Sequence, residues 1–345
     1  MTDFPNPEDL TGFDEIRRLM RELPGPDLEA ASAVATREAQ LTKPAGALGR
    51  LEEITQWLAT WQGRKQPRIN RPRIAVFAAN HGVAAQGVSA YPSSVTRQMV
   101  DNFLQGGAAV NQLVGTIDGD LRVYELDLDN PTADFTVEAA MSEAACAQAM
   151  AYGMMAVEAG IDVLGLGEMG IGNTTSAAAL CLGLFGGTAE EWVGPGTGVS
   201  GEALARKIAV VDKAYALHKD ACGKDALKWL AAVGGLELAA IAGAVLAARL
   251  AKTPVLLDGF VSTAAAAVVY AIDPRALDHC LVAHVSAEPG HRRLIAKIGQ
   301  EPLLDLGMRL GEGSGAAVAV SLLRAAATCH SGMATFGQAG VSGPV

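Results

Sequence analysis

The feature that most constrains the fold is an alternation of short apolar runs with longer helical patterns. Five runs have the composition and length of buried strands, and helical spacing of apolar residues lies between most of them. These runs are residues 74–79, 121–126, 161–166, 255–257 and 281–285. Strands that alternate with helices form βαβ units around a parallel sheet. The sequence therefore predicts an α/β fold, with a mostly parallel sheet flanked by helices.

Four of the five runs end in a polar or glycine-bearing turn. The turns are Asn80-His81-Gly82, Gly167-Glu168-Met169-Gly170, Asp258-Gly259-Phe260 and the Ser-Ala-Glu-Pro-Gly-His segment at 286–291. In open parallel sheets, ligands bind outside the carboxyl ends of the strands. We therefore expect the four turns to line one cleft at one edge of the sheet.

The segment Gly-Ile-Gly-Asn-Thr-Thr at 170–175 leads from one run into a helical pattern. Its glycines let backbone N–H groups approach an anion, and a helix N-terminus favours negative charge. The segment matches neither the P-loop nor GxGxxG, so a phosphate site and an ordinary tight turn both remain open. A second glycine-rich segment, 191–200, precedes a helical pattern with three basic residues, each a candidate phosphate partner or a solvated charge. They are Arg206, Lys207 and Lys213.

A carboxylate stands in another glycine-rich turn, Arg-Leu-Gly-Glu-Gly-Ser-Gly-Ala-Ala at 309–317. Glu312 lies between two glycines, just before an alanine-rich pattern that predicts a helix over 316–327. A carboxylate among small apolar residues has a raised pKa and can accept a proton. An acid before a helix is also stabilised by the helix dipole alone. From the residues, Glu312 is either a general base or a helix-terminus charge.

Other local patterns narrow the class of site. Tyr91, Met99 and Phe103 suit the wall of a flat apolar pocket, with ordinary core packing as the alternative. The six histidines form no HExxH or other tight ligand set, so we expect no metal site. No Gly-x-Ser-x-Gly elbow is present, which argues against a hydrolase triad.

Charge, cysteine content and apolar stretches indicate the class of partner and the cellular compartment. The formal net charge of −10 argues against nucleic acid as the main partner. Five single cysteines without a CxxC pair, and an acidic, proline-bearing start, predict a cytoplasmic protein without a signal peptide. Residues 229–250 are apolar and long enough to span a bilayer. Because Glu237 and two adjacent glycines interrupt them, we expect a buried or subunit-interface helix and no membrane span.

Taken together, the motifs resemble those of nicotinate-nucleotide–dimethylbenzimidazole phosphoribosyltransferases. The matching segments follow the family's order and span most of the chain: 41–54, 80–96, 167–175, 256–266, 286–291 and 306–317. The resemblance implies a Rossmann-like large domain over residues 71–304. It also implies a smaller helical domain from both chain ends, residues 1–70 and 305–345. A homodimer without a metal or redox cofactor is implied as well.

The resemblance further implies a reaction. The phosphoribosyl group of nicotinate mononucleotide moves to a nitrogen of 5,6-dimethylbenzimidazole, nicotinate leaves, and α-ribazole 5′-phosphate forms with inversion at C1′. By the match to RLGEGSGAA, Glu312 is the general base that takes the N–H proton of the benzimidazole. By the match to GEMG, Glu168 lies near the ribose and the reacting centre.

The same match assigns the remaining site residues to two groups. The phosphate and ribose group comprises Gly170, Gly172, Asn173, Thr174, Lys207, Ser286 and Gly311. The slot for the flat base comprises Tyr91, Met99, Met169 and Leu310. The chain departs from the family at Asn80, where many relatives carry an aspartate, so a charge role at that position is not carried over.

Three alternatives stay open. A nucleotide-linked oxidoreductase is disfavoured, because GxGxxG and a ribose-binding acid about 20 residues further on are both missing. A non-catalytic nucleotide-binding protein would keep the cleft, although Glu168 and Glu312 argue against it. The acceptor is also open between dimethylbenzimidazole, another benzimidazole, adenine and a phenolic compound, because a flat apolar pocket discriminates weakly between isosteres.

Overall fold

A five-stranded parallel sheet forms the centre of the protein. The computed structural model describes residues 11–343, and its strands are β1 (Pro72–Ala78), β2 (Asp120–Glu125), β3 (Val163–Met169), β4 (Val255–Leu257) and β5 (Cys280–Val282). Their order in the sheet is β2-β1-β3-β4-β5, and all neighbours are parallel. Each predicted run forms a strand, and the α/β prediction is confirmed. This strand order is that of a doubly wound sheet whose switch point lies between β1 and β3.

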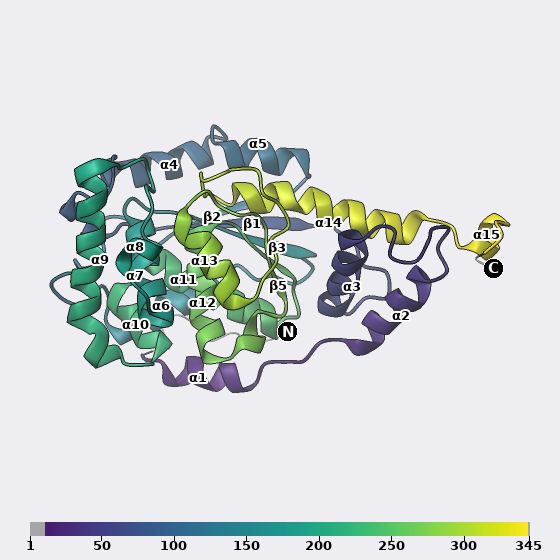
Figure 1. The fold of residues 1–345 in the computed structure, drawn as a ribbon, viewed down its shortest axis with the longest axis horizontal. Coiled ribbons are helices and arrows are strands. Elements are labelled where there is room, and N and C mark those ends of the chain that lie inside the picture. The colour runs from purple at the N-terminus through teal and green to yellow at the C-terminus, as the bar shows by residue number, and fades with distance from the viewer. Residues whose placement is uncertain (1–10, 344–345) are drawn as a thin grey trace.

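Helices connect the strands and surround the sheet (Figure 1). Those before and between the first strands are α1 (Asp14–Arg21), α2 (Leu28–Glu38), α3 (Arg50–Gln62), η2 (Gly82–Gln86), α4 (Ser94–Leu104), α5 (Ala109–Thr116) and α6 (Glu143–Met154). The later ones are α7 (Asn173–Phe185), α8 (Ala189–Trp192), α9 (Gly201–Cys222), α10 (Ala226–Val233), α11 (Leu236–Leu250), α12 (Phe260–Ile272), η3 (Pro274–Leu277), α13 (Pro289–Ile298), α14 (Ser314–Gly332) and α15 (Phe336–Ala339).

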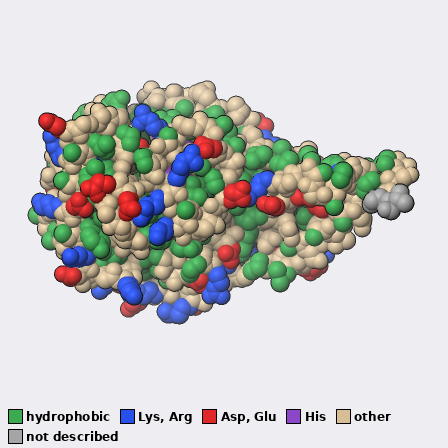
Figure 2. All heavy atoms as spheres, viewed as in Figure 1, with side chains coloured by type: hydrophobic (Ala, Val, Ile, Leu, Met, Phe, Trp, Pro, Cys, Tyr) green, Lys and Arg blue, Asp and Glu red, His purple; other side chains and the backbone are tan. Residues whose placement is uncertain are grey.

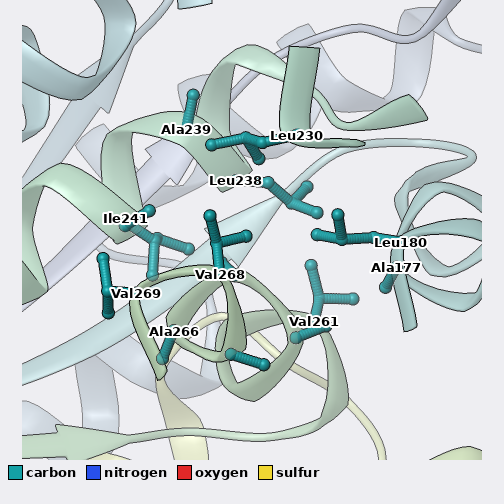
Figure 3. Packing of buried hydrophobic residues seen from close by; sticks show 14 of the residues in the cluster. Ala177, Leu180, Leu230, Leu238, Ala239, Ile241, Val261, Ala266, Val268 and Val269 are labelled. Atoms are coloured by element: carbon teal, nitrogen blue, oxygen red, sulfur yellow. The ribbon is translucent and has the colours of Figure 1, made fainter. Parts of the chain in front are cut away.

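Helices cover both faces of the sheet, and β1, β3 and β4 are accordingly largely apolar and buried. The edge strand β2 is only partly buried and carries charged residues. In β1, Ala75 and Phe77 pack into one core cluster, and Ile74 and Val76 pack into another. Helices α11 and α12 contact the sheet on the first side, and α14, α4 and α5 contact it on the other. The larger core lies among α7, α10, α11 and α12, where leucine, valine, isoleucine and alanine side chains interdigitate (Figure 3).

Helix α14 crosses the sheet at unusually close range. A methyl group built on Gly167 of β3 would collide with the backbone of Glu312 and Gly313. A methyl group on Gly165 would lie 3.0 Å from the Ala316 side chain. The two strand glycines therefore bring the start of α14 directly against the carboxyl end of β3, as expected for glycine at a close backbone approach.

The apolar stretch 229–250 forms two helices and not the single helix that we predicted. Helix α10 ends before Gly234 and α11 begins after Gly235. Here the backbone turns so that Glu237, in the first turn of α11, points into the interior and is fully buried. Across residues 11–343, no helix is long and apolar enough to cross a membrane.

Helices α2 and α3 lie beside the C-terminal half of α14 on one side of the sheet (Figure 1). Helices α2 and α3 pack together, α3 packs on α14, and the Arg37 side chain donates to the carbonyls of His330 and Met333. In Figure 1 this part projects from the main body, with α15 at its tip. Helix α1 does not join this part but lies on the main body, where Arg17 pairs with Asp225 at 2.9 Å. Figure 2 shows acidic and basic side chains interspersed on the viewed face.

Candidate active site

A cavity of about 700 Å³ opens at the carboxyl ends of the strands, beside the switch point of the sheet. The turns that follow β3, β4 and β5 all contribute to its wall, as the sequence predicted. Further wall segments come from the start of α4, from residues 196–197 and from the turn before α14. Of the thirteen predicted site residues, eleven line this cavity. They are Tyr91, Met99, Glu168, Met169, Gly170, Asn173, Thr174, Ser286, Leu310, Gly311 and Glu312.

The fourth predicted turn, Asn80-His81-Gly82, lies behind the cavity wall and not in it. His81 Nε2 lies 2.5 Å from Glu237 Oε1, and both side chains are fully buried. A methyl group on Gly170 would lie 2.9 Å from the same Glu237 oxygen, so this pair supports the Gly170 turn from behind. The Asn80 side chain donates to the Leu128 carbonyl at 2.8 Å and has a structural role here. The prediction that all four turns line the cleft was therefore wrong for this one.

Glu168 lies at the end of β3 in ordinary strand backbone. Its Oε2 accepts a hydrogen bond from the Asn173 side chain, in the first turn of α7. Burial raises the pKa of Glu168 to about 8, against the opposing effect of the Asn173 hydrogen bond. The nearby carboxylates of Asp258, Glu237 and Glu312 raise this pKa further. At neutral pH the Glu168 carboxyl therefore carries its proton.

Glu312 is held in a strained turn. Its φ of 64° lies in the left-handed region, between Gly311 at 82° and Gly313 at 77°. Non-glycine residues in that region are uncommon and are concentrated at functional sites. Asp258, at the end of β4, holds the turn by accepting the backbone N–H groups of Gly313 at 3.1 Å and Ala316 at 2.9 Å.

The environment of Glu312 suits proton transfer. The residue is only 5% exposed, and it lines the cavity. Burial raises the pKa of Glu312 to about 7, and the carboxylate of Asp258 adds to the rise. A carboxylate with a pKa near 7 is matched to general acid–base work at neutral pH. Helix α14 begins at Ser314, two residues earlier than the predicted helix.

Most, but not all, of the residues predicted to bind the phosphate and ribose line the cavity. Gly172 and Lys207 do not line it. Lys207 is fully buried and donates from Nζ to Thr174 Oγ1 at 2.8 Å and to the Gly194 carbonyl at 3.0 Å. Burial lowers the pKa of Lys207 to about 8, opposed by the charge of Glu288. A methyl group on Gly196 would lie 2.8 Å from Nζ, so the lysine stands directly behind the wall that Gly196 forms.

The predicted base slot lies at the mouth of the cavity. Tyr91 and Leu310 are each 55% exposed, and Met99 and Met169 are half-buried between them and the interior. Phe103 does not join this wall. It is 2% exposed and packs in the core beneath α4 and α5, so core packing was the correct interpretation there.

Four polar residues of the wall were not predicted individually: Thr197, His284, Glu288 and Arg309. Glu288 Oε1 accepts the N–H of Gly196 at 2.9 Å, and Arg309 Nη1 donates to the Gly196 carbonyl at 2.9 Å. His284, just after β5, is buried and also lines the cavity. Glu288 and Arg309 stand inside matched motifs, which was the available signal. His284 lies inside the predicted apolar run 281–285 and belongs to no matched motif.

Comparison with known proteins agrees with this geometry. A family model described as a phosphoribosyltransferase matches residues 23–341. The nicotinate-nucleotide–dimethylbenzimidazole phosphoribosyltransferase of Brucella canis is 62% identical over 330 residues, which is 96% of this chain and 97% of that protein. The enzyme of the same name from Brucella anthropi is 61% identical over 331 residues, with the same coverage.

A solved structure gives the same result. The crystal structure of the phosphoribosyltransferase of that name from Thermus thermophilus has a TM-score of 0.83 and 43% sequence identity. The match covers 92% of this chain and 99% of that chain. The chain therefore belongs to the nicotinate-nucleotide–dimethylbenzimidazole phosphoribosyltransferase family and is a phosphoribosyltransferase.

Proposed function

We propose that the protein transfers the phosphoribosyl group of nicotinate mononucleotide to 5,6-dimethylbenzimidazole, releasing nicotinate and forming α-ribazole 5′-phosphate. The names of its relatives support these two substrates. The observation that carries the proposal is a pair of carboxyl groups, Glu168 and Glu312, facing one cavity with pKa values raised by burial. Such pairs divide acid and base roles between them.

Glu312 is the general base of the proposed reaction. It takes the N–H proton of the benzimidazole while the other ring nitrogen attacks C1′. The bond between C1′ and the nicotinate nitrogen breaks, and its electron pair leaves with nicotinate. Because the acceptor attacks the face opposite the leaving group, the configuration at C1′ inverts. The left-handed turn held by Asp258 supports this role, since it fixes the backbone of Glu312 at the cavity wall.

The donor's sugar and phosphate occupy the deeper end, along the turns after β3 and β5. Gly170, Gly172 and the N-terminus of α7 offer backbone N–H groups, and Asn173, Thr174, Ser286 and Gly311 lie nearby in the proposed arrangement. Lys207 lies behind Gly196 and does not touch the ligand. Its ammonium group donates a hydrogen bond to Thr174, which lines the cavity, and its positive charge favours an anion there. Glu168, as a neutral carboxylic acid, is placed to donate a hydrogen bond toward the ribose.

The flat acceptor occupies the mouth, between Tyr91, Met99, Met169 and Leu310. Aromatic and methionine side chains form adaptable walls for such rings. The acceptor identity is the least constrained part of the proposal, and another benzimidazole, adenine or a phenolic compound is the alternative. A non-catalytic nucleotide-binding protein is the second alternative function.

The test is a chromatographic assay with nicotinate mononucleotide and each acceptor in turn. We expect nicotinate and a ribosylated base to appear together and in equal amounts only when 5,6-dimethylbenzimidazole is present. Nuclear Overhauser contacts across the sugar of the product will show the α configuration. Binding of the mononucleotide without nicotinate release with any acceptor would identify a binding protein instead. Release without an acceptor would indicate hydrolysis.

We further propose a cytoplasmic homodimer in which the predicted segments 1–70 and 305–345 form a small unit beside a large unit, 71–304, except that α1 packs on the large unit. The five cysteines are all unpaired thiols in the described structure, which suits a reducing compartment. The packing of α3 on α14 supports the joining of the two ends. Light scattering of the purified protein tests the dimer, and a monomer at assay concentration would contradict it.

A further inference from the structure

His284 differs from the other histidines of the chain. Of six histidines, five have at least one ring nitrogen paired with a protein group. The partners are Glu237 for His81, Phe135 for His218, Val245 for His279, Thr263 and Ser286 for His291, and Glu38 for His330. Within residues 11–343, neither Nδ1 nor Nε2 of His284 has a hydrogen-bond partner, although the side chain is only 1% exposed.

The unpaired ring of His284 lies at the wall of the cavity, where a ligand could supply the missing hydrogen-bond partner. Buried polar groups are nearly always hydrogen-bonded, so an exception calls for an explanation such as a ligand. His284 lines the same cavity as Ser286, Gly259 and Glu312. A methyl group on Gly315 would collide with Cδ2 of the ring and lie 2.7 Å from Nε2, and a methyl group on Gly259 would lie 3.3 Å from Nε2. The missing side chains of these two glycines leave room for the Nε2 edge of the ring beside the cavity wall.

Asp258 lies beside the ring without binding it. Its Oδ1 is 3.8 Å from His284 Nε2, beyond hydrogen-bond distance. Both Asp258 oxygens are occupied by the backbone N–H groups of Gly313 and Ala316. The Asp258 carboxyl group therefore makes no hydrogen bond to the ring and leaves Nε2 free for another partner.

The proposed donor substrate indicates which acceptor this is, because its ribosyl phosphate is an oxygen-rich anion. Three carboxyl groups, those of Glu168, Glu288 and Glu312, line the wall. The one cationic side chain among the lining residues, Arg309, reaches across the mouth to Gly196. An oxygen-rich, anionic ligand in such a cavity needs donors in the interior, and His284 is a buried side chain with free donor capacity there.

We propose that His284 is a further substrate-contacting residue, whose ring N–H donates a hydrogen bond to an oxygen of the ribosyl phosphate of the donor substrate. This inference rests on the proposed function, because that function puts a ribosyl phosphate in the cavity. Asp258 lies beside both residues, since it accepts the backbone N–H groups of the Glu312 turn and its Oδ1 is 3.8 Å from His284 Nε2.

Binding measurements on three variants test the proposal. We expect His284→Phe, which keeps the ring volume and removes the donor, to raise the calorimetric dissociation constant for nicotinate mononucleotide roughly 10- to 100-fold. His284→Gln, whose amide nitrogen reaches the position of Nε2, should recover part of the affinity. The matched control is His218→Gln, another buried histidine, bonded to the Phe135 carbonyl and outside the cavity. The control should bind the mononucleotide like the parent protein.

A spectroscopic readout keeps the test independent of variant folding. In protein labelled with ¹⁵N-histidine, the His284 signals are those missing from the His284→Gln spectrum. Saturating nicotinate mononucleotide should shift the Nε2 signal. A shift with inorganic phosphate alone assigns the contact to the phosphate, and a shift with nicotinate riboside alone assigns it to the ribose. An unmoved His284 signal at saturation, or parent-like affinity in His284→Phe, overturns the proposal.

Failure of the proposed function would be seen in the turnover assay and not in the His284 signal. In that case nicotinate is not released from the parent protein with any acceptor, whatever the His284 signal does. A His284 shift without turnover would support the contact and overturn the reaction. Turnover without a shift would support the reaction and overturn the contact.

Discussion

Two glycine-rich turns of this protein each carry one carboxyl group into the same cavity, and they do so by different means. Glu168 ends a strand in ordinary backbone and receives a hydrogen bond from Asn173. Glu312 has a left-handed φ of 64°, and its carboxylate has no hydrogen-bond partner in the described part of the chain. The turns touch at Gly311, where a methyl group would collide with Glu168 Oε1.

The difference between the turns separates the two chemical roles. Burial raises both pKa values, but three neighbouring carboxylates add to the rise at Glu168 and one adds to the rise at Glu312. Glu168, with a pKa of about 8, is neutral at pH 7, whereas Glu312, with a pKa of about 7, is partly ionised. A proton acceptor must be ionised before the reaction begins. The comparison supports the proposed roles, in which Glu312 is the base and Glu168 is a hydrogen-bond donor.

The largest expected effect comes from Glu312→Gln. Removing the base should lower kcat by about 10²- to 10⁴-fold at pH 7, the usual contribution of general base catalysis. Affinity for nicotinate mononucleotide should remain, since the change keeps the size of the side chain. Steady-state kinetics and calorimetry on the same preparation measure both quantities. A variant with parent-like kcat would remove Glu312 from the mechanism.

The second prediction concerns stability and pH. The folded protein binds the Glu312 proton with a pKa of about 7, compared with 4.5 for an ordinary glutamate. The stability that this proton contributes is fully present below pH 4.5 and is lost as the pH rises through 7, by about 3 kcal/mol. Glu312→Gln should therefore gain stability relative to the parent between pH 5 and pH 9.

Urea unfolding at pH 5, 7 and 9 checks this prediction. The control is Glu29→Gln, a change at an exposed carboxylate that pairs with Lys65 on the surface. A constant difference in unfolding free energy between the parent and Glu312→Gln at all three pH values would show that Glu312 ionises normally.

A smaller effect is expected from Gly311→Ala, which acts on both turns at once. The residue has a φ of 82°, where a side chain costs about 1–2 kcal/mol, and the new methyl group would displace the Glu168 carboxyl. We expect kcat to fall roughly 10-fold, since a small misplacement of reacting groups is costly. The control Gly340→Ala has a similar φ of 64° but no atom within 4 Å. Equal activity in the two variants would mean that the turns are independent.

The smallest effect should come from Glu168→Gln. If Glu168 acts as a neutral donor, an amide replaces it with little loss, less than about 10-fold in kcat/KM at pH 7. Above pH 8 the variant should hold its activity while the parent declines, because only the parent acquires a second negative charge beside Glu312. A loss as large as that of Glu312→Gln would assign Glu168 an ionised role.

Much of the fold was predictable from the sequence. The five predicted runs form five parallel strands, and the inner ones are apolar because helices cover both sheet faces. The two adjacent glycines at 234 and 235 were visible in the sequence, but the break of the helix there was not predicted, because apolar content does not report where a backbone turns. The break accompanies a tertiary contact, the buried pair of Glu237 and His81.

The site was predictable where motifs mark it and not elsewhere. The two carboxylates stand in glycine-rich turns, and the structure brings those turns together at the carboxyl ends of the strands. Lys207 was expected to face the ligand, but a helix pattern cannot show that Thr174 and Gly194 hold its amine behind the wall. His284 had no local signal, since its significance depends on the partners it lacks in three dimensions.

The most direct test of the account is the pH dependence of kcat/KM in the parent, Glu168→Gln and Glu312→Gln. The account predicts an activity rise with a midpoint near pH 7 in the parent, as Glu312 ionises. That rise should persist in Glu168→Gln and disappear in Glu312→Gln, whose residual activity should be flat. A rise that persists in Glu312→Gln and disappears in Glu168→Gln would contradict the assignment and make Glu168 the base.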